Sequence, residues 1–303
     1  MQRHPGSQEA INQSGKCFIV TGANTGIGLE ISRVLATRGA RVLLGCRDKA
    51  KAEAAMAKIR SLTPEADLAF LSLDQADLES IRAAAALAAK EPRIDGLINN
   101  AGVMNTPLMR TKQGFELQFG VNHLGTFALT ALLLPKLSES KGARVVVTSS
   151  LAHRNARIDW DDLNAEKSYS PFKRYAPSKL ANALFFFELN RRLRALGSPV
   201  TAVGCHPGMA ATDLALHGSA PDLKPDRQRG PQQRRQRCMA RAAGRDRKRH
   251  AGGYYGPIGL GGVRGVSGEA SRAPQATDPA LARRLWDVSI AMTGVDPGLP
   301  PMS

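Results

Sequence analysis

Short apolar runs alternate with amphipathic segments along most of the chain, from Lys16 to about Cys205. In the first amphipathic segment, Ile27 and Ile31 stand at helical spacing and Gly39 ends the pattern. The runs predicted as strands are residues 16–23, 40–46, 66–74, 94–102, 143–150 and 198–208, and the predicted helices are residues 27–39, 48–60, 77–90, 115–137, 174–197 and 277–294. Strands this apolar, separated by helices, are typical of a parallel sheet covered on both faces. The pattern therefore predicts an α/β fold with a doubly wound parallel sheet of the Rossmann type.

The composition supports one globular domain, which we place at residues 14–303. The 303 residues include 43% hydrophobic and 22% charged side chains, and no stretch approaches the roughly 18 consecutive apolar residues that would span a bilayer. The polar first sixteen residues lack the apolar core of a signal peptide, so we expect a cytoplasmic protein. Four cysteines, at 17, 46, 205 and 238, show no zinc-like spacing, and we expect no metal site.

Half of the net charge of +16 comes from one segment, because residues 222–250 hold eleven Lys or Arg and three Asp. The rest of the chain is only mildly basic. A basic domain for nucleic acid is therefore not indicated, and the feature to explain is a local one.

A glycine-rich turn, TGANTGIG at 21–28, joins the first predicted strand to the first predicted helix. Glycines at 22, 26 and 28 let the backbone approach a pyrophosphate and let the helix pack close to the sheet. The helix N-terminus then offers free N–H groups to the phosphates. This arrangement predicts a dinucleotide site, although an ordinary strand-to-helix turn would also use glycine.

The end of the second strand bears on which dinucleotide is bound. An acid there binds the ribose 2′-hydroxyl of NAD, whereas a cation accommodates the 2′-phosphate of NADP. Cys46 occupies the position of the acid and Arg47 follows it, which favours NADP(H). Asp48 nearby weakens the argument, and a merely solvated Arg47 is the alternative.

Six motifs in order resemble the short-chain dehydrogenase/reductase family: TGANTGIG at 21–28, NNAG at 99–102, VNHLGTF at 121–127, TSS at 148–150, YAPSK at 175–179 and HPG at 206–208. CRD, IDWDDLN, SKLANALF and RRLWDVS resemble its retinol dehydrogenase-like branch. The resemblance covers residues 14–220 and resumes at about Gly252. It implies an oxidoreductase that transfers hydride between NADP(H) and an apolar alcohol or carbonyl compound, and homodimers or homotetramers formed through the long helices.

Tyr175 and Lys179 stand at i and i+4, so both project from one face of a helix. Free tyrosine has a pKa of about 10, and a nearby ammonium lowers such a pKa by roughly 1–3 units. We therefore predict that Tyr175 is the general acid/base. Pro177 is expected in the first turn of this helix, where its missing N–H costs no hydrogen bond.

The resemblance assigns roles to further residues. It implies that Ser150 orients the substrate oxygen, with Ser149 as the alternative, and that Lys179 also holds the nicotinamide ribose. Asn122 would hold a water that relays protons to Lys179, or it kinks the helix. The residues expected to contact the cofactor are Gly22, Asn24, Gly26, Ile27, Gly28, Arg47, Asp74, Asn100, Gly102, Tyr175, Lys179 and Thr212. A helix cap is the alternative for Thr212. His123, His153 and His206 have no metal-ligand spacing and are interpreted as structural.

The resemblance fails at residues 227–250, where the family has apolar helices that close over the substrate. Besides alanines, this segment offers only Cys238 and Met239 as apolar side chains, so we expect residues 222–250 to be disordered or a loosely held loop. Binding of nucleic acid or an anionic membrane, a solvated insertion, and a short stretch read out of frame in a GC-rich gene all remain open.

A compromised lid predicts NADPH binding with reduced or absent turnover. A non-catalytic NADP(H)-binding protein of the same fold is the second hypothesis, and an anion-binding accessory protein is the third. Ser150, Tyr175 and Lys179 favour the enzyme, because binding alone would not require them together.

Overall fold

A computed structural model describes residues 12–208 and 252–301. Its sheet has eight strands in the order β3-β2-β1-β4-β5-β6-β7-β8, all parallel except the last pair, β7 and β8. The strands are β1 (Cys17–Thr21), β2 (Arg41–Cys46), β3 (Leu68–Ser72), β4 (Gly96–Asn99), β5 (Arg144–Thr148), β6 (Thr201–Cys205), β7 (Tyr254–Gly259) and β8 (Arg264–Glu269). From β1 to β3 the chain builds the sheet outward in one direction. It then returns to the other side of β1, where β4 begins the second half of the sheet. The predicted doubly wound parallel sheet is confirmed.

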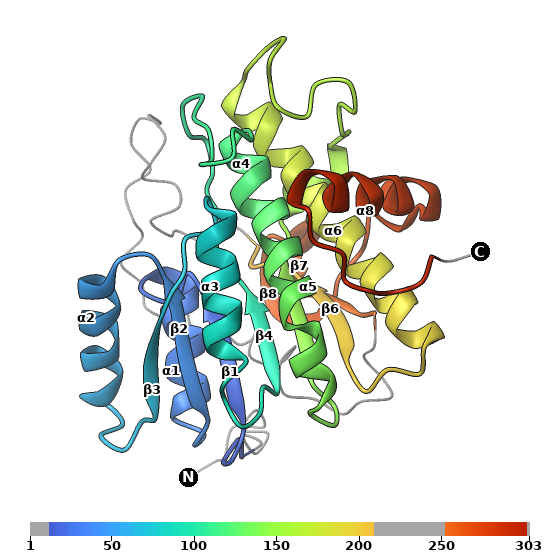
Figure 1. Cartoon of the computed structure of the whole chain (residues 1–303). Coiled ribbons are helices and arrows are strands. Elements are labelled where there is room, and N and C mark those ends of the chain that lie inside the picture. The colour runs from blue at the N-terminus through green and yellow to red at the C-terminus, as the bar shows by residue number, and fades with distance from the viewer. Residues whose placement is uncertain (1–11, 209–251, 302–303) are drawn as a thin grey trace.

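Helices cover both faces of the sheet (Figure 1). The helices are α1 (Gly26–Ala36), α2 (Lys49–Arg60), α3 (Leu78–Ala88), α4 (Leu117–Phe119), α5 (Gly125–Ser138), α6 (Pro171–Ala195) and α8 (Pro279–Thr293). Side chains of α1 and α2 form one core with the sheet, and those of α3, α5 and α6 form a second core on the other face. Helix α8 packs against α6 and adds Leu285 and Trp286 to this second core.

Local sequence signals account for several helix ends. Asp48 accepts a hydrogen bond from the backbone N–H of Lys51 and caps α2 (3.0 Å), and Asp77 caps α3 in the same way. Asp278 caps α8, and Gly294 ends it in the left-handed conformation (φ 63°). Asp48 and Asp278 thus stand at the start of the helices predicted at 48–60 and 277–294.

The long helix predicted at 115–137 differs from the expected regular α-helix. Glu116 caps α4, and a π-helical turn, η1 (Gly120–Leu124), separates α4 from α5. The continuous helix Leu117–Ser138 is long and apolar enough to cross a membrane, but 89% of its apolar window is buried inside the protein. It packs as a core helix between the sheet and its neighbours.

Two features of the carboxyl-terminal half depart from the sequence predictions. Strands β7 and β8 form a hairpin that extends the sheet beyond β6, although its glycine-rich sequence shows no clear strand pattern. Helix α6 begins at Pro171, so Pro177 lies inside the helix and not in its first turn. This proline therefore removes a helical hydrogen bond next to Tyr175, which corrects the prediction.

Candidate active site

Three side chains predicted to be catalytic meet where β5 ends. Ser150 is the second residue after β5 and caps a short 3-10 turn, η2 (Leu151–Asn155), while Tyr175 and Lys179 come from α6. The Ser150 hydroxyl lies close enough to the phenol of Tyr175 to lower the pKa of that phenol. The Nζ atom of Lys179 lies 5.7 Å from the centroid of the Tyr175 ring. The carboxyl edge of a parallel sheet is where such folds place their ligands, and these residues lie there.

The two serines at this edge have different surroundings. The Ser149 hydroxyl is buried and donates to the backbone carbonyl of Lys179 (2.7 Å), so it is engaged inside the protein. Ser150 is half-buried, and its hydroxyl is the one that lies toward Tyr175. The geometry therefore favours Ser150 over Ser149 as the hydroxyl available to a substrate.

Burial has the largest effect on the pKa values of Tyr175 and Lys179, which both lie on α6. It raises the pKa of Tyr175 above its ordinary value, and the interaction with Ser150 opposes this rise. It lowers the pKa of Lys179 to about 8. The prediction that Lys179 lowers the pKa of Tyr175 is not seen here, because loss of solvent outweighs the charge of an ammonium nearly 6 Å from the ring.

Lys179 is fixed by contacts that involve a residue which sequence reasoning missed. Its Nζ donates to the carbonyl of Thr148 (3.4 Å), and the same carbonyl accepts a hydrogen bond from the amide of Asn182 (3.0 Å). Asn182 is 2% exposed on the inner face of α6. A polar amide within the apolar stretch LANALFFF was the signal that could have identified it.

Asn122 lies in the π-helical turn and is fully buried. Its Oδ1 accepts from the N–H of Val103 (2.7 Å), and its Nδ2 donates to the carbonyl of Val103 and to the Ser178 hydroxyl (2.9 Å each). Asn122 thus ties the segment after β4 to α6, one residue before Lys179. The alternative weighed for Asn122 was that it kinks the helix, and the helix is π-helical at this position. Gly102 adjoins Asn122 closely enough that a Cβ there would lie 3.0 Å from Oδ1.

The glycine-rich turn has the close approaches that a dinucleotide site requires. A Cβ on Gly28 would lie 2.2 Å from the carbonyl oxygen of Gly22 and 2.7 Å from the amide of Asn100. Gly22 and Gly26 both have positive φ angles, 64° and 54°, which favour glycine. The turn therefore leaves its backbone open at the start of α1, and the residues present fit the pyrophosphate of a nicotinamide dinucleotide.

Asn24 and Ile27 in this turn are half-buried. Asn100 reaches back from the end of β4 and donates to the Thr21 carbonyl (2.9 Å), which connects the ends of β4 and β1. Asp74, after β3, accepts from the N–H of Ala76 (2.9 Å) and is half-buried. All of these residues lie along the same carboxyl edge of the sheet as Ser150.

Arg47 is exposed at the end of β2 and forms no ion pair with any residue that the structure describes. Asp48 points its carboxylate into the start of α2, where it caps the helix and contacts Lys51. Cys46 is buried and carries no charge toward the site. The guanidinium of Arg47 is thus available to an anion, and Asp48 is already engaged.

Other predicted features are placed elsewhere. Thr212 and the basic segment 222–250 lie outside the described residues. His123 and His206 are fully buried, and burial lowers their pKa values to about 3 and about 4. No cluster of potential metal ligands occurs among residues 12–208 and 252–301.

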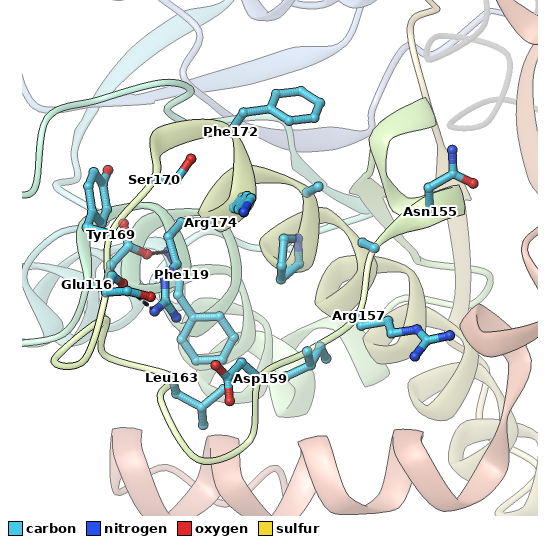
Figure 2. A pocket seen from close by; sticks show the side chains of 16 residues that line it. Glu116, Phe119, Asn155, Arg157, Asp159, Leu163, Tyr169, Ser170, Phe172 and Arg174 are labelled. Atoms are coloured by element: carbon cyan, nitrogen blue, oxygen red, sulfur yellow. Dashed lines mark hydrogen bonds between the residues drawn. The ribbon is translucent and has the colours of Figure 1, made fainter.

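Figure 2 shows a pocket of about 520 Å³ beside the first turns of α6. Glu116, Phe119, Leu163 and Arg174 lie around it, together with residues of the loop before α6. Ser150, Tyr175 and Lys179 do not line this pocket. It is therefore separate from the candidate active site.

The comparisons with known proteins agree with the fold and the motifs. The family model for short chain dehydrogenases matches residues 16–220. The chain is 39% identical to retinol dehydrogenase 14 of Mus musculus, over 97% of this chain and 90% of the relative, and 43% identical to retinol dehydrogenase 13 of Homo sapiens, over 93% and 86%. The chain belongs to the short-chain dehydrogenase family and is therefore an oxidoreductase that uses a nicotinamide cofactor. Within the family it falls in the retinol dehydrogenase-like branch, as the motifs predicted.

Solved structures are similar to this chain in fold and sequence. A putative uncharacterized protein from Mycobacterium paratuberculosis is 38% identical, with a TM-score of 0.78 over 96% of this chain and 97% of that one. A short chain dehydrogenase from Burkholderia cenocepacia J2315, in complex with NADP, is 26% identical, with a TM-score of 0.55 over 69% and 79%.

Proposed function

We propose that the protein catalyses NADP(H)-dependent interconversion of an apolar carbonyl compound and its alcohol, with Tyr175 as the general acid/base. The observation that carries this proposal is the meeting of Ser150, Tyr175 and Lys179 at the carboxyl end of β5. Apolar substrates are favoured by the similarity to retinol dehydrogenases, whose names state an apolar alcohol.

The bound nicotinamide supplies or accepts the hydride. The Ser150 hydroxyl orients the substrate oxygen, and the Tyr175 phenol donates a proton to that oxygen as the carbonyl is reduced. Because burial raises the pKa of Tyr175, the phenol keeps its proton at neutral pH, which suits reduction. Lys179 contributes a positive charge beside the ring and, by resemblance, holds the nicotinamide ribose.

The backbone of the glycine-rich turn and the start of α1 would hold the pyrophosphate of the cofactor. Asp74 and Asn100 would contact its adenosine side, and Gly102 would leave space beside Asn122 and Lys179. Arg47 supports NADP(H) over NAD(H), because its exposed guanidinium can pair with a 2′-phosphate. The NADP complex of the Burkholderia cenocepacia relative is consistent with this choice.

The test combines NADPH and NADH fluorescence titrations with an assay of NADPH consumption on apolar aldehydes and ketones. We expect NADPH to bind more tightly than NADH and the carbonyl compounds to be reduced. NADPH binding without reduction of any apolar carbonyl, and without oxidation of the matching alcohols, would instead support a non-catalytic dinucleotide-binding protein.

A further inference from the structure

The imidazole of His153 contacts the backbone of Ser150 directly. His153 lies in the 3-10 turn η2 and is 1% exposed. Its Nδ1 lies 2.6 Å from the carbonyl oxygen of Ser150. Because a carbonyl oxygen only accepts, Nδ1 must carry the hydrogen, and the neutral ring then has its lone pair on Nε2.

The second ring nitrogen connects this turn to the end of the chain. Nε2 accepts from the backbone N–H of Ala273 at 3.4 Å, in the segment after β8. The ring also packs edge-on against Tyr254 of β7, with centroids 5.4 Å apart and planes at 78°. Tyr254 in turn stacks on Phe186 of α6 (5.8 Å, 11°). One imidazole therefore joins the end of β5 to the hairpin and the segment that follows it.

The surroundings of His153 favour its neutral form. Burial lowers its pKa, the hydrogen bond to the Ser150 carbonyl opposes this, and the guanidinium of Arg154 lowers the pKa further. His206, after the end of β6, contacts the same Tyr254 ring (centroids 5.3 Å apart), and burial lowers the pKa of His206 to about 4. Tyr175 faces Ser150, the ammonium of Lys179 and, farther away, the phenol of Tyr254.

We propose that His153 is a positioning residue for Ser150: its Nδ1–H holds the Ser150 carbonyl, and so fixes the direction in which the Ser150 hydroxyl leaves the end of β5. The proposal rests on the proposed function, because it matters only if Ser150 acts on the substrate oxygen and on Tyr175. It replaces the prediction that His153 is only structural. His153 acts through Ser150 and does not touch the substrate.

Two substitutions separate the hydrogen bonds of the ring. His153→Asn keeps an amide N–H close to the position of Nδ1, whereas His153→Gln reaches the position of Nε2 and loses the donor to Ser150. We expect kcat for carbonyl reduction to fall by about 10- to 100-fold in His153→Gln and to stay within about 3-fold in His153→Asn. NADPH affinity, measured by fluorescence, stays unchanged in both, because the glycine-rich turn is remote from the substitution.

A second readout does not depend on turnover. The Ser150 interaction lowers the pKa of Tyr175, so a displaced Ser150 hydroxyl should raise it. Carbon-13 NMR of ζ-labelled tyrosine, with Tyr175→Phe to assign the signal among the four tyrosines, measures that pKa. We expect a rise of about 0.5 unit or more in His153→Gln and Ser150→Ala, and none in His153→Asn.

Four outcomes are decisive. If Ser150→Ala changes neither kcat nor the pKa of Tyr175, the proposed role of Ser150 fails, and the present inference fails with it. If Ser150→Ala has both effects but the Asn and Gln variants behave alike, only the role of His153 fails. Nitrogen-15 NMR of the unmodified protein provides a test without a variant, because a hydrogen on Nε2 in place of Nδ1 overturns the proposal. A ring with the hydrogen on Nδ1, together with the Asn–Gln difference, supports it.

Discussion

Burial and a neighbouring hydroxyl act in opposite directions on the phenol of Tyr175. The i, i+4 spacing of Tyr175 and Lys179 was readable from the sequence, because side-chain direction on a helix is local. The extent of burial was not readable, because it depends on how α6 packs against the sheet and η2. The same limit applied to Asn122, whose partners Val103 and Ser178 come from two other segments. At the residue scale, the candidates were predictable but their ionisation and partners were not.

A charge at the end of β2 provides a test of cofactor preference. In Arg47→Gln we expect NADPH affinity to fall by about 10- to 100-fold, with NADH affinity changed little, because a charge-assisted hydrogen bond to the 2′-phosphate is lost. Lys49→Gln is the matched control, since it removes the same charge from an exposed position at the start of α2. Fluorescence titration of both cofactors provides the measurement. Equal losses in the two variants would show a general charge effect and no specific contact of Arg47.

At the scale of elements, helix caps and parallel strands were predictable because their signals are local or periodic. Asp48 and Asp278 lie next to the helices that they cap, and the apolar runs correspond to β1–β6. The hairpin β7–β8 was not predicted, because its many glycines leave no alternation of apolar and polar side chains. The hairpin is held in the sheet by the pairing of β7 with β6. The π-helical turn was missed because it depends on contacts outside its own helix.

Two buried histidines make the fold sensitive to acid. Unfolded histidine has a pKa near 6.5, whereas burial holds His123 at about 3 and His206 at about 4. Between these values the unfolded chain binds more protons than the folded one, so stability falls as the pH falls. For His123 alone, the loss between pH 7 and pH 5 is about 2 kcal/mol.

The matching variant is His123→Gln, which keeps a polar group near Ser289 but does not titrate. Urea unfolding at pH 7 and pH 5 should show a difference between the two pH values that is smaller by about 2 kcal/mol in the variant. Any packing cost of the substitution affects both pH values and cancels. The same pH dependence in variant and unmodified protein would show that His123 is not held neutral.

At the scale of the whole molecule, other parts of the chain pack over the long helices. The helix Leu117–Ser138 is largely buried, and α8 packs on α6 through Trp286, over which Arg192 stacks (4.3 Å). Glu188, fully buried, pairs with Arg192, which also contacts the carbonyl of Leu299 in the terminal segment. Part of the surface of the long helices, through which the resemblance implies dimers or tetramers, is thus covered by other parts of the chain.

We therefore expect a monomer. Light scattering after size-exclusion chromatography should give the mass of one chain, 32.4 kDa, at micromolar concentration. A stable dimer that persists after dilution would show that another surface of the protein associates.

The prediction of a compromised substrate lid comes from the sequence alone, because residues 209–251 lie outside the described part of the chain. Since residues 227–250 offer almost no apolar side chains, we expect a high KM and low turnover on bulky apolar ketones, with NADPH affinity intact. Steady-state kinetics beside an NADPH titration tests this. Efficient turnover of a bulky ketone at low concentration would contradict a compromised lid.

The most direct test of the central claim follows the hydride and the proton donor together. NADPH carrying deuterium at the transferred position is mixed with an apolar ketone and either the unmodified protein or Tyr175→Phe, and the alcohol is analysed by mass spectrometry. We expect deuterium on the carbinol carbon with the unmodified protein. With Tyr175→Phe we expect at least about 100-fold slower transfer and nearly unchanged NADPH binding. Equal rates of deuterium transfer in the two proteins would contradict the role of Tyr175.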